Sequence, residues 1–176
     1  MKKVYISADN LVREAFLLAR KIYDSGYRPD AMVVLWRGGT PVGIVLHEYF
    51  MFRGIDSYHT VVKASSYKGI GKRAEVVVEH LPALAASLPE NASVLVIDDI
   101  FDSGCTLKKM KTELAEHCRE IKTATLYYKH GFNQTDIEPD FYGRSTQDWI
   151  VFPHEICGLS LEEIAVKDPA LPEIVS

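Results

Sequence analysis

The sequence predicts an α/β protein whose mostly parallel, twisted sheet is flanked by helices, with a small lobe that forms a hood. The first observation is the alternation of strand-like and helix-like segments between residues 31 and 128, because such repeats place parallel strands in one sheet. The second is a pair of continuous apolar runs, Ala-Met-Val-Val-Leu-Trp at 31–36 and Val-Leu-Val-Ile at 94–97, which are typical of buried strands. Both observations favour a sheet with helices on its two faces.

The elements are predicted from periodicity and from their end signals. We expect helices over 9–25, 40–53 and 106–118, strands over 31–36, 58–64, 75–79, 94–99 and 121–128, a polar loop over 65–74, and an irregular tail over about 130–158. Asp9 is the expected N-cap of the first helix and Gly26 its stop. Thr40 and Pro41 mark the start of the second, because a polar cap followed by proline suits a first helical turn.

Length and composition indicate one domain. The 176 residues are 47% hydrophobic and 25% charged, which is enough apolar material for a sizeable core and excludes a disordered chain. We expect a single domain over 1–176, with its core at about 1–128 and the hood mainly at about 129–176. The net charge of −4 gives no global support for nucleic-acid binding.

The cysteines and the apolar runs indicate in which cellular compartment we expect the protein. Cys105, Cys118 and Cys157 are odd in number and widely spaced, which argues against a disulfide framework or a zinc site and favours a reducing cytoplasm. No apolar run approaches the roughly 20 residues that a membrane span needs, so we expect no membrane partner. The two N-terminal lysines are followed by Asp9 before any long apolar region, which argues against a secretory signal.

The most informative segment is residues 94–106. Four apolar residues lead directly into Asp98 and Asp99, and the polar turn Asp102-Ser103-Gly104-Cys105-Thr106 then opens a helix. Carboxylates can hold sugar hydroxyls or a hydrated metal ion, and a turn at a helix N-terminus can hold a phosphate. The segment therefore predicts a site for a phosphorylated sugar with its metal.

This segment resembles the phosphoribosyl-pyrophosphate (PRPP) motif of the type I phosphoribosyltransferases. The resemblance implies the fold of that family, Mg²⁺ as cofactor and PRPP as substrate. It assigns PRPP and ribose binding to residues 98–99 and 102–106, and it makes Asp102 the catalytic base that accepts a proton from the purine. Cys105 departs from the glycine or lysine that relatives often carry.

Two further turns fit the same resemblance. Arg37-Gly38-Gly39 follows a strand and opens a helix, where glycines let the backbone approach an anion. In purine phosphoribosyltransferases a similar turn contacts pyrophosphate. Ser66-Tyr67 looks like the start of the mobile loop of those enzymes, with Lys68, Lys72 and Arg73 adding charge. These residues are the predicted pyrophosphate site, although a simple turn and a solvated loop are the plain alternatives.

The base site is expected from the last third of the chain. A lysine at the place of Lys129 contacts the purine O6 in the family that recognises 6-oxopurines, although a surface lysine at a strand end is the common alternative. Trp149 resembles the ring that stacks on the base, and Ile150 adjoins it, with backbone carbonyls there accepting from the base edge. Glu155 lies near the place of a carboxylate that helps Asp98 and Asp99 hold magnesium, partly through water.

The resemblance thus implies a hypoxanthine, guanine or xanthine phosphoribosyltransferase of purine salvage, converting base and PRPP to nucleoside monophosphate and pyrophosphate. It also implies a homo-oligomer, either a dimer or a tetramer. Two alternatives stay open. One is a phosphoribosyltransferase for another base, such as adenine, uracil or orotate. The other is a regulator of the same fold that senses PRPP or nucleotide and binds nucleic acid, which the charge of −4 disfavours.

Overall fold

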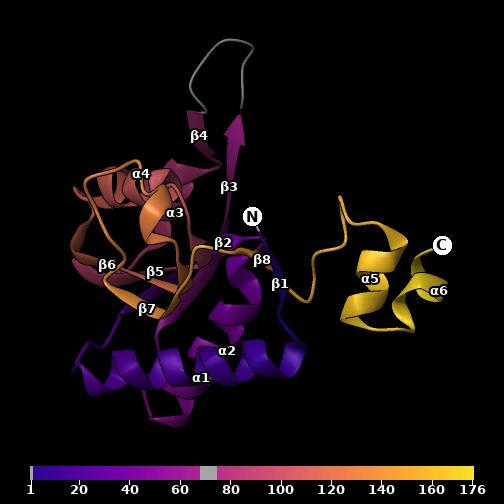
Figure 1. The fold of residues 1–176 in the computed structure, drawn as a ribbon. Helices are drawn as coiled ribbons and strands as arrows, with labels where there is room; N and C mark the ends of the chain where they lie inside the picture. The colour runs from indigo at the N-terminus through magenta and orange to yellow at the C-terminus, as the bar shows by residue number, and fades with distance from the viewer. Residues whose placement is uncertain (1, 68–74) are drawn as a thin grey trace.

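A computed structural model describes residues 2–67 and 75–176 (Figure 1). Its strands are β1 (Lys3–Tyr5), β2 (Ala31–Trp36), β3 (Tyr58–Tyr67), β4 (Glu75–Val78), β5 (Ala92–Phe101), β6 (Cys118–Tyr128), β7 (Phe141–Ser145) and β8 (Trp149–Val151). Its helices are α1 (Ala8–Asp24), α2 (Gly39–Phe52), α3 (Leu81–Ser87), α4 (Cys105–Leu114), α5 (Leu161–Lys167) and α6 (Leu171–Val175), with a 3₁₀ turn, η1, at His130–Phe132.

The predicted fold class is confirmed. Within the described residues, the main sheet has six strands in the order β4-β3-β2-β5-β6-β7. The pairs β2–β3, β2–β5, β5–β6 and β6–β7 are parallel, and β3 pairs with β4 in antiparallel fashion. Because β2, β5 and β6 all end at the same edge, the segments that follow them come together there.

Two apolar layers bury the sheet. Side chains that alternate along β2 and β5 point to opposite faces: Met32 and Leu95 pack with α1 and α2, whereas Val33 and Val96 pack with α3 and α4. Figure 1 shows α1 and α2 on one side of the sheet and α3 and α4 on the other. A strand buried on both faces has to be apolar at every position, which explains the continuous runs in the sequence.

Several predicted boundaries were wrong. The first two helices begin at Ala8 and Gly39. Ser7 caps α1 in place of Asp9, because its Oγ accepts the Asn10 N–H at 3.2 Å. The helix predicted to reach 118 ends at Leu114, since residues from 118 onward pair with β5 as the start of β6. Residues 65–67, expected in a loop, extend β3 through pairing with β4. Periodicity within a segment does not report such pairing with a distant strand.

The tail expected to be irregular contains β7 and β8. β7 adds a parallel strand to the main sheet, with Phe141 opposite Ala124. β8 forms a separate parallel pair with β1, in which Val4 lies opposite Ile150. Beyond residue 128, β7 thus belongs to the main sheet, whereas β8 pairs with β1 in a separate two-stranded sheet.

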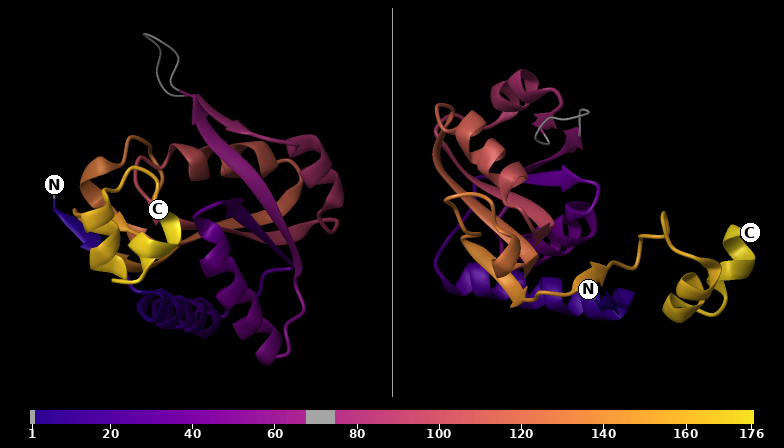
Figure 2. Two further views of the ribbon diagram at one scale, coloured as in Figure 1. Left: turned by 90° about the vertical axis from the view of Figure 1, so that its right-hand side faces the viewer. Right: turned by 45° about the horizontal axis from the view of Figure 1, so that its top comes forward.

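The C-terminal helices α5 and α6 follow β8 in the chain. Figures 1 and 2 show α5 and α6 apart from the four helices that cover the sheet. In the part of the chain that the structure describes, no helix combines the length and apolar character needed to cross a bilayer.

Candidate functional site

The acid pair lies near the carboxyl end of β5, a strand in the middle of the main sheet. The Asp98 Oδ1 accepts the backbone N–H of Asp99 at 3.0 Å. Burial, followed by the charge of Asp99, raises the pKa of Asp98 well above its ordinary value. Burial also raises the pKa of Asp99 to about 6, and the negative charge of Glu155 acts in the same direction. The free protein thus holds two carboxylates at an energetic cost that a bound cation or ribose hydroxyls would relieve.

The Arg37-Gly38-Gly39 turn closes against this pair. A Cβ at Gly38 would lie 2.1 Å from Asp99 Oδ2, and a Cβ at Gly39 would lie 2.6 Å from the carbonyl oxygen of Ile97. Glycine at 39 lets this turn approach the backbone of β5, and glycine at 38 leaves room for the Asp99 carboxylate. The peptide bond between Trp36 and Arg37 is cis. The structure therefore brings the predicted pyrophosphate turn next to the predicted ribose and metal carboxylates.

The predicted phosphate turn caps α4. Gly104 has a φ of +78° and serves as the N-cap, so the turn uses the left-handed region that favours glycine. The Cys105 N–H donates to Ser103 Oγ at 3.4 Å. A small hollow of about 70 Å³ is lined by Asp98, Asp102, Ser103, Gly104 and Thr106 together with apolar neighbours. Helix N–H groups and two hydroxyls at such a hollow suit a phosphate.

The base-side residues converge on a buried lysine. Lys129 follows β6 with only 4% of its side chain exposed, and its Nζ donates to Asp102 Oδ2 at 3.2 Å. The same Nζ lies 5.2 Å from the ring centroid of Trp149 and 5.2 Å from that of Phe132. Trp149 is 51% exposed, so about half of this residue is accessible. The burial of Lys129 excludes the alternative that it is an ordinary surface lysine.

Phe132 is a neighbour of Lys129 in the candidate site that sequence reasoning missed. It lies in η1, three residues beyond Lys129, and its backbone N–H donates to the Lys129 carbonyl at 3.2 Å. Its position three residues after Lys129, which was predicted to contact the base, is the sequence feature that could have indicated it.

Glu155, the last of the predicted metal carboxylates, lies in the turn that follows β8. Glu155 Oε2 accepts the backbone N–H of Phe152 at 3.0 Å. Its negative charge contributes to the raised pKa of Asp99. Burial lowers the pKa of His154 in the same turn, the charge of Glu155 opposes that shift, and the positive charge of Arg37 adds to it.

The donors at this edge fit magnesium bound with a phosphorylated substrate. Among the described residues, no three His, Cys, Asp or Glu side chains gather tightly enough to hold an ion by themselves. Mg²⁺ commonly uses one or two carboxylates and completes its octahedron with water and substrate phosphate oxygens. The half-buried Asp98–Asp99 pair is such an oxygen donor set.

The remaining predicted residues are placed only in part. Ser66 and Tyr67 pair through their backbones with Val76 and Glu75 of β4. Lys68, Lys72 and Arg73 lie outside the described residues. Ile150 is buried in β8 with 7% of its surface exposed.

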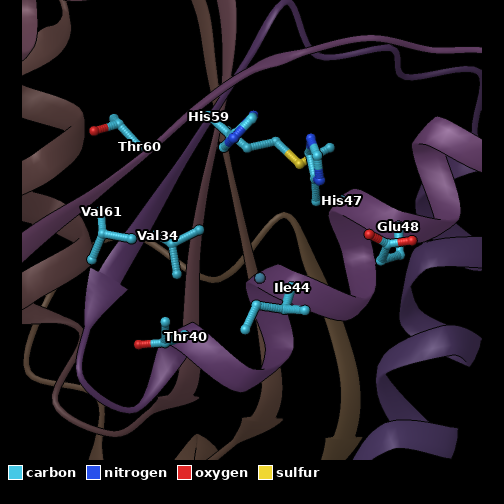
Figure 3. Close-up of a pocket in the computed structure, with 10 residues that line it drawn as sticks. Val34, Thr40, Ile44, His47, Glu48, His59, Thr60 and Val61 are labelled. Atoms are coloured by element: carbon cyan, nitrogen blue, oxygen red, sulfur yellow. The ribbon is translucent and has the colours of Figure 1, made fainter.

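A separate pocket of about 240 Å³ lies between α2 and β3 (Figure 3). The rings of His47 and His59 are 4.2 Å apart beside it, and Val34 and Ile44 line its apolar part. The predicted site residues are not among those that line this pocket, so it is distinct from the site at the ends of β5 and β6.

Comparison with known proteins agrees with this geometry. The family model described as "Phosphoribosyl transferase domain" matches residues 7–159. The hypoxanthine-guanine phosphoribosyltransferase of Staphylococcus epidermidis is 32% identical over 171 residues, covering 93% of this chain and 88% of that protein.

Two solved structures extend the comparison. A purine phosphoribosyltransferase from Pyrococcus horikoshii has a TM-score of 0.71 at 29% identity, covering 91% of this chain and 99% of that one. A hypothetical protein from Neisseria gonorrhoeae with bound ppGpp has a TM-score of 0.80 at 22% identity, covering 96% and 97%.

The fold and site define a phosphoribosyltransferase-type α/β protein. The chain belongs to the type I phosphoribosyltransferase family, and purine phosphoribosyltransferases are among its homologues at about 30% identity.

Proposed function

We propose that the protein is a 6-oxopurine phosphoribosyltransferase of purine salvage, converting hypoxanthine, guanine or xanthine and PRPP to the nucleoside 5′-monophosphate and pyrophosphate. The observation that carries the proposal is the buried Lys129, held by Asp102 and lying beside Trp149. A buried ammonium is a donor that suits a carbonyl oxygen, and the adjacent carboxylate suits a ring N–H. A 6-oxopurine presents both groups on one edge of the ring system, the carbonyl oxygen O6 on C6 and the N–H at N7.

In the proposed reaction, the purine N9 forms a bond to C1′ of the ribose while the bond from C1′ to the pyrophosphate oxygen breaks. The proton that the purine loses goes to Asp102, acting as general base at N7. Lys129 then donates to O6, and the two side chains exchange their mutual ion pair for contacts with the base. Stacking on Trp149 holds the purine plane.

The other residues fix PRPP. Asp98 and Asp99 accept from the ribose hydroxyls, and the turn at 102–106 binds the 5′-phosphate. Arg37 and the Gly38-Gly39 backbone bind the departing pyrophosphate. Mg²⁺, when bound with PRPP, supplies charge neutralisation on that leaving group. A cytoplasmic location and assembly as a dimer or tetramer belong to the same proposal and are supported by family membership alone.

A second candidate is a nucleotide-sensing protein of the same fold. The Neisseria structure with bound ppGpp favours it, since a guanine nucleotide with phosphates at both ends could use the base side and both phosphate turns. Such a protein would bind nucleotide without turning over any base. Its nucleic-acid-binding form predicts a gel shift at physiological salt.

The test is a product assay with Mg²⁺ and PRPP against hypoxanthine, guanine, xanthine, adenine, uracil and orotate. Nucleotide formed from one or more of the first three supports the proposal and ranks the bases. Turnover of adenine or a pyrimidine in their place contradicts the assigned roles of Lys129 and Trp149. Nucleotide binding with no turnover of any base favours the second candidate.

A further inference from the structure

Two aromatic rings lie against the ammonium group of Lys129. The Nζ is 5.2 Å from the ring centroid of Phe132 and 5.2 Å from that of Trp149, and only 4% of the lysine side chain is exposed. Its ion-pair partner Asp102 keeps 48% of its side chain exposed. The pair is therefore asymmetric, because the carboxylate faces water whereas the ammonium is covered.

The covered ammonium has more donors than the protein uses. An ammonium carries three N–H donors and no acceptor. Within residues 2–67 and 75–176, Asp102 Oδ2 is the one hydrogen-bond acceptor of Lys129 Nζ, at 3.2 Å. Aromatic rings attract such a cation while they keep water away from it. A ligand that brings an acceptor atom to this ammonium is thus favoured, and a ligand that brings another donor is disfavoured.

Phe132 is held in place by the segment that carries it. The residue belongs to the 3₁₀ turn η1. Directly after it, Asn133 Nδ2 donates to the Ile137 carbonyl at 2.8 Å. The Gln134 N–H donates to the Ser103 carbonyl at 2.9 Å, which joins this segment to the predicted phosphate turn. The ring of Phe132 is therefore presented to the site by a hydrogen-bonded segment of the protein core.

We propose that Phe132 is a specificity-determining residue of the base site, which acts through Lys129 to favour a 6-oxopurine over a 6-aminopurine. The inference rests on the proposed function, because it takes the Lys129 ammonium to be the partner of O6. Since the Phe132 ring keeps water from this ammonium, an amino group on C6 meets donors that no solvent can satisfy. Buried polar groups left without a partner are what allow a site to reject an analogue strongly.

The experiment compares the binding of inosine 5′-monophosphate (IMP) and adenosine 5′-monophosphate (AMP), which differ at C6 and the adjoining N1, by isothermal titration calorimetry. We expect Phe132→Ala to lower the ratio of IMP affinity to AMP affinity about 10-fold, because water then reaches the ammonium. Phe132→Tyr keeps an aromatic ring and should restore most of the ratio. Ribose 5-phosphate, which has no base, should bind Phe132→Ala as it binds the wild type.

Two controls separate this role from a structural one. Phe52→Ala removes a ring that is 85% exposed at the end of α2, and it should leave the ratio unchanged. In the Lys129→Met background, Phe132→Ala should have no additional effect on the ratio, because the group through which Phe132 acts is then absent. Thermal unfolding shows whether each variant is folded, and Phe132→Val, which also uncovers the ammonium, replaces an alanine variant that does not fold.

The proposal is overturned if Phe132→Ala keeps the wild-type ratio, if it lowers the ratio equally in the Lys129→Met background, or if it weakens IMP, AMP and ribose 5-phosphate alike. A wild-type protein that does not bind IMP more tightly than AMP overturns it as well. By contrast, IMP-selective binding without turnover of any base in the product assay refutes the proposed enzymatic function, while the effect of Phe132→Ala on the ratio still decides the role of Phe132.

Discussion

Replacing Asp99 by asparagine should stabilise the ligand-free protein while weakening PRPP binding. Burial raises the pKa of Asp99 from an ordinary value of 3.8 to about 6. The folded protein therefore binds a proton that the unfolded chain has released between those two pH values, and stability falls as pH rises through this window. The gap of about two pH units corresponds to roughly 3 kcal/mol at pH 7, at about 1.4 kcal/mol per unit.

About 3 kcal/mol is the upper limit of the stabilisation by Asp99→Asn, because the asparagine amide is still a polar group that needs hydrogen-bond partners. A gain of about 1–3 kcal/mol should raise Tm by roughly 3–10 °C in a chain of this size. At pH 4, close to the ordinary pKa of 3.8, most of this contribution has gone, so the difference between the two proteins should be much smaller than at pH 7.

The assay is thermal unfolding by circular dichroism at pH 7 and pH 4, without Mg²⁺, phosphate or nucleotide. Asp136→Asn is a control of opposite sign, since the ion pair with Lys108 lowers the pKa of that exposed carboxyl, and it should not raise Tm. A Tm for Asp99→Asn that is unchanged or lower at pH 7, or raised equally at both pH values, would refute the reasoning.

Three further substitutions test the site. Asp102→Asn should lower kcat about 100-fold through loss of the general base, with little change in KM for PRPP; unchanged kcat would remove Asp102 from the mechanism. Lys129→Met keeps the buried stem but loses a charged hydrogen bond worth about 1.5–3 kcal/mol, so KM for a 6-oxopurine should rise about 10- to 100-fold, and an unaltered KM would contradict the O6 contact. Gly39→Ala places a methyl group 2.6 Å from the Ile97 carbonyl oxygen and should destabilise the protein by about 1–3 kcal/mol; a wild-type Tm would show that the turn can move.

The segment at 94–106 shows what local sequence can specify. Strand, acid pair, turn and helix are contiguous there, so their register is fixed by the order of residues alone. The structure has a strand through the predicted 94–99 and a helix that begins one residue before the predicted 106, although that helix ends at Leu114. The fold class was predictable for a similar reason, because alternation of strands and helices constrains a parallel sheet.

The boundaries that failed depend on partners distant in sequence. β7 carries few apolar residues, yet it completes the sheet because β6 offers it an edge. β6 begins earlier than expected because its first residues pair with Ala92 of β5. Neither pairing leaves a periodic signal in the segment itself.

The sequence by itself determined the sheet, the acid pair, the phosphate turn and the residue types available to a purine. Tertiary structure alone decided that Gly38 lies against Asp99 and that Lys129 is buried against Asp102 beside Trp149. Each of these contacts joins segments that follow different strands or helices. Their distances depend on strand order, twist and packing of the whole chain, which the spacing of residues along one segment does not encode.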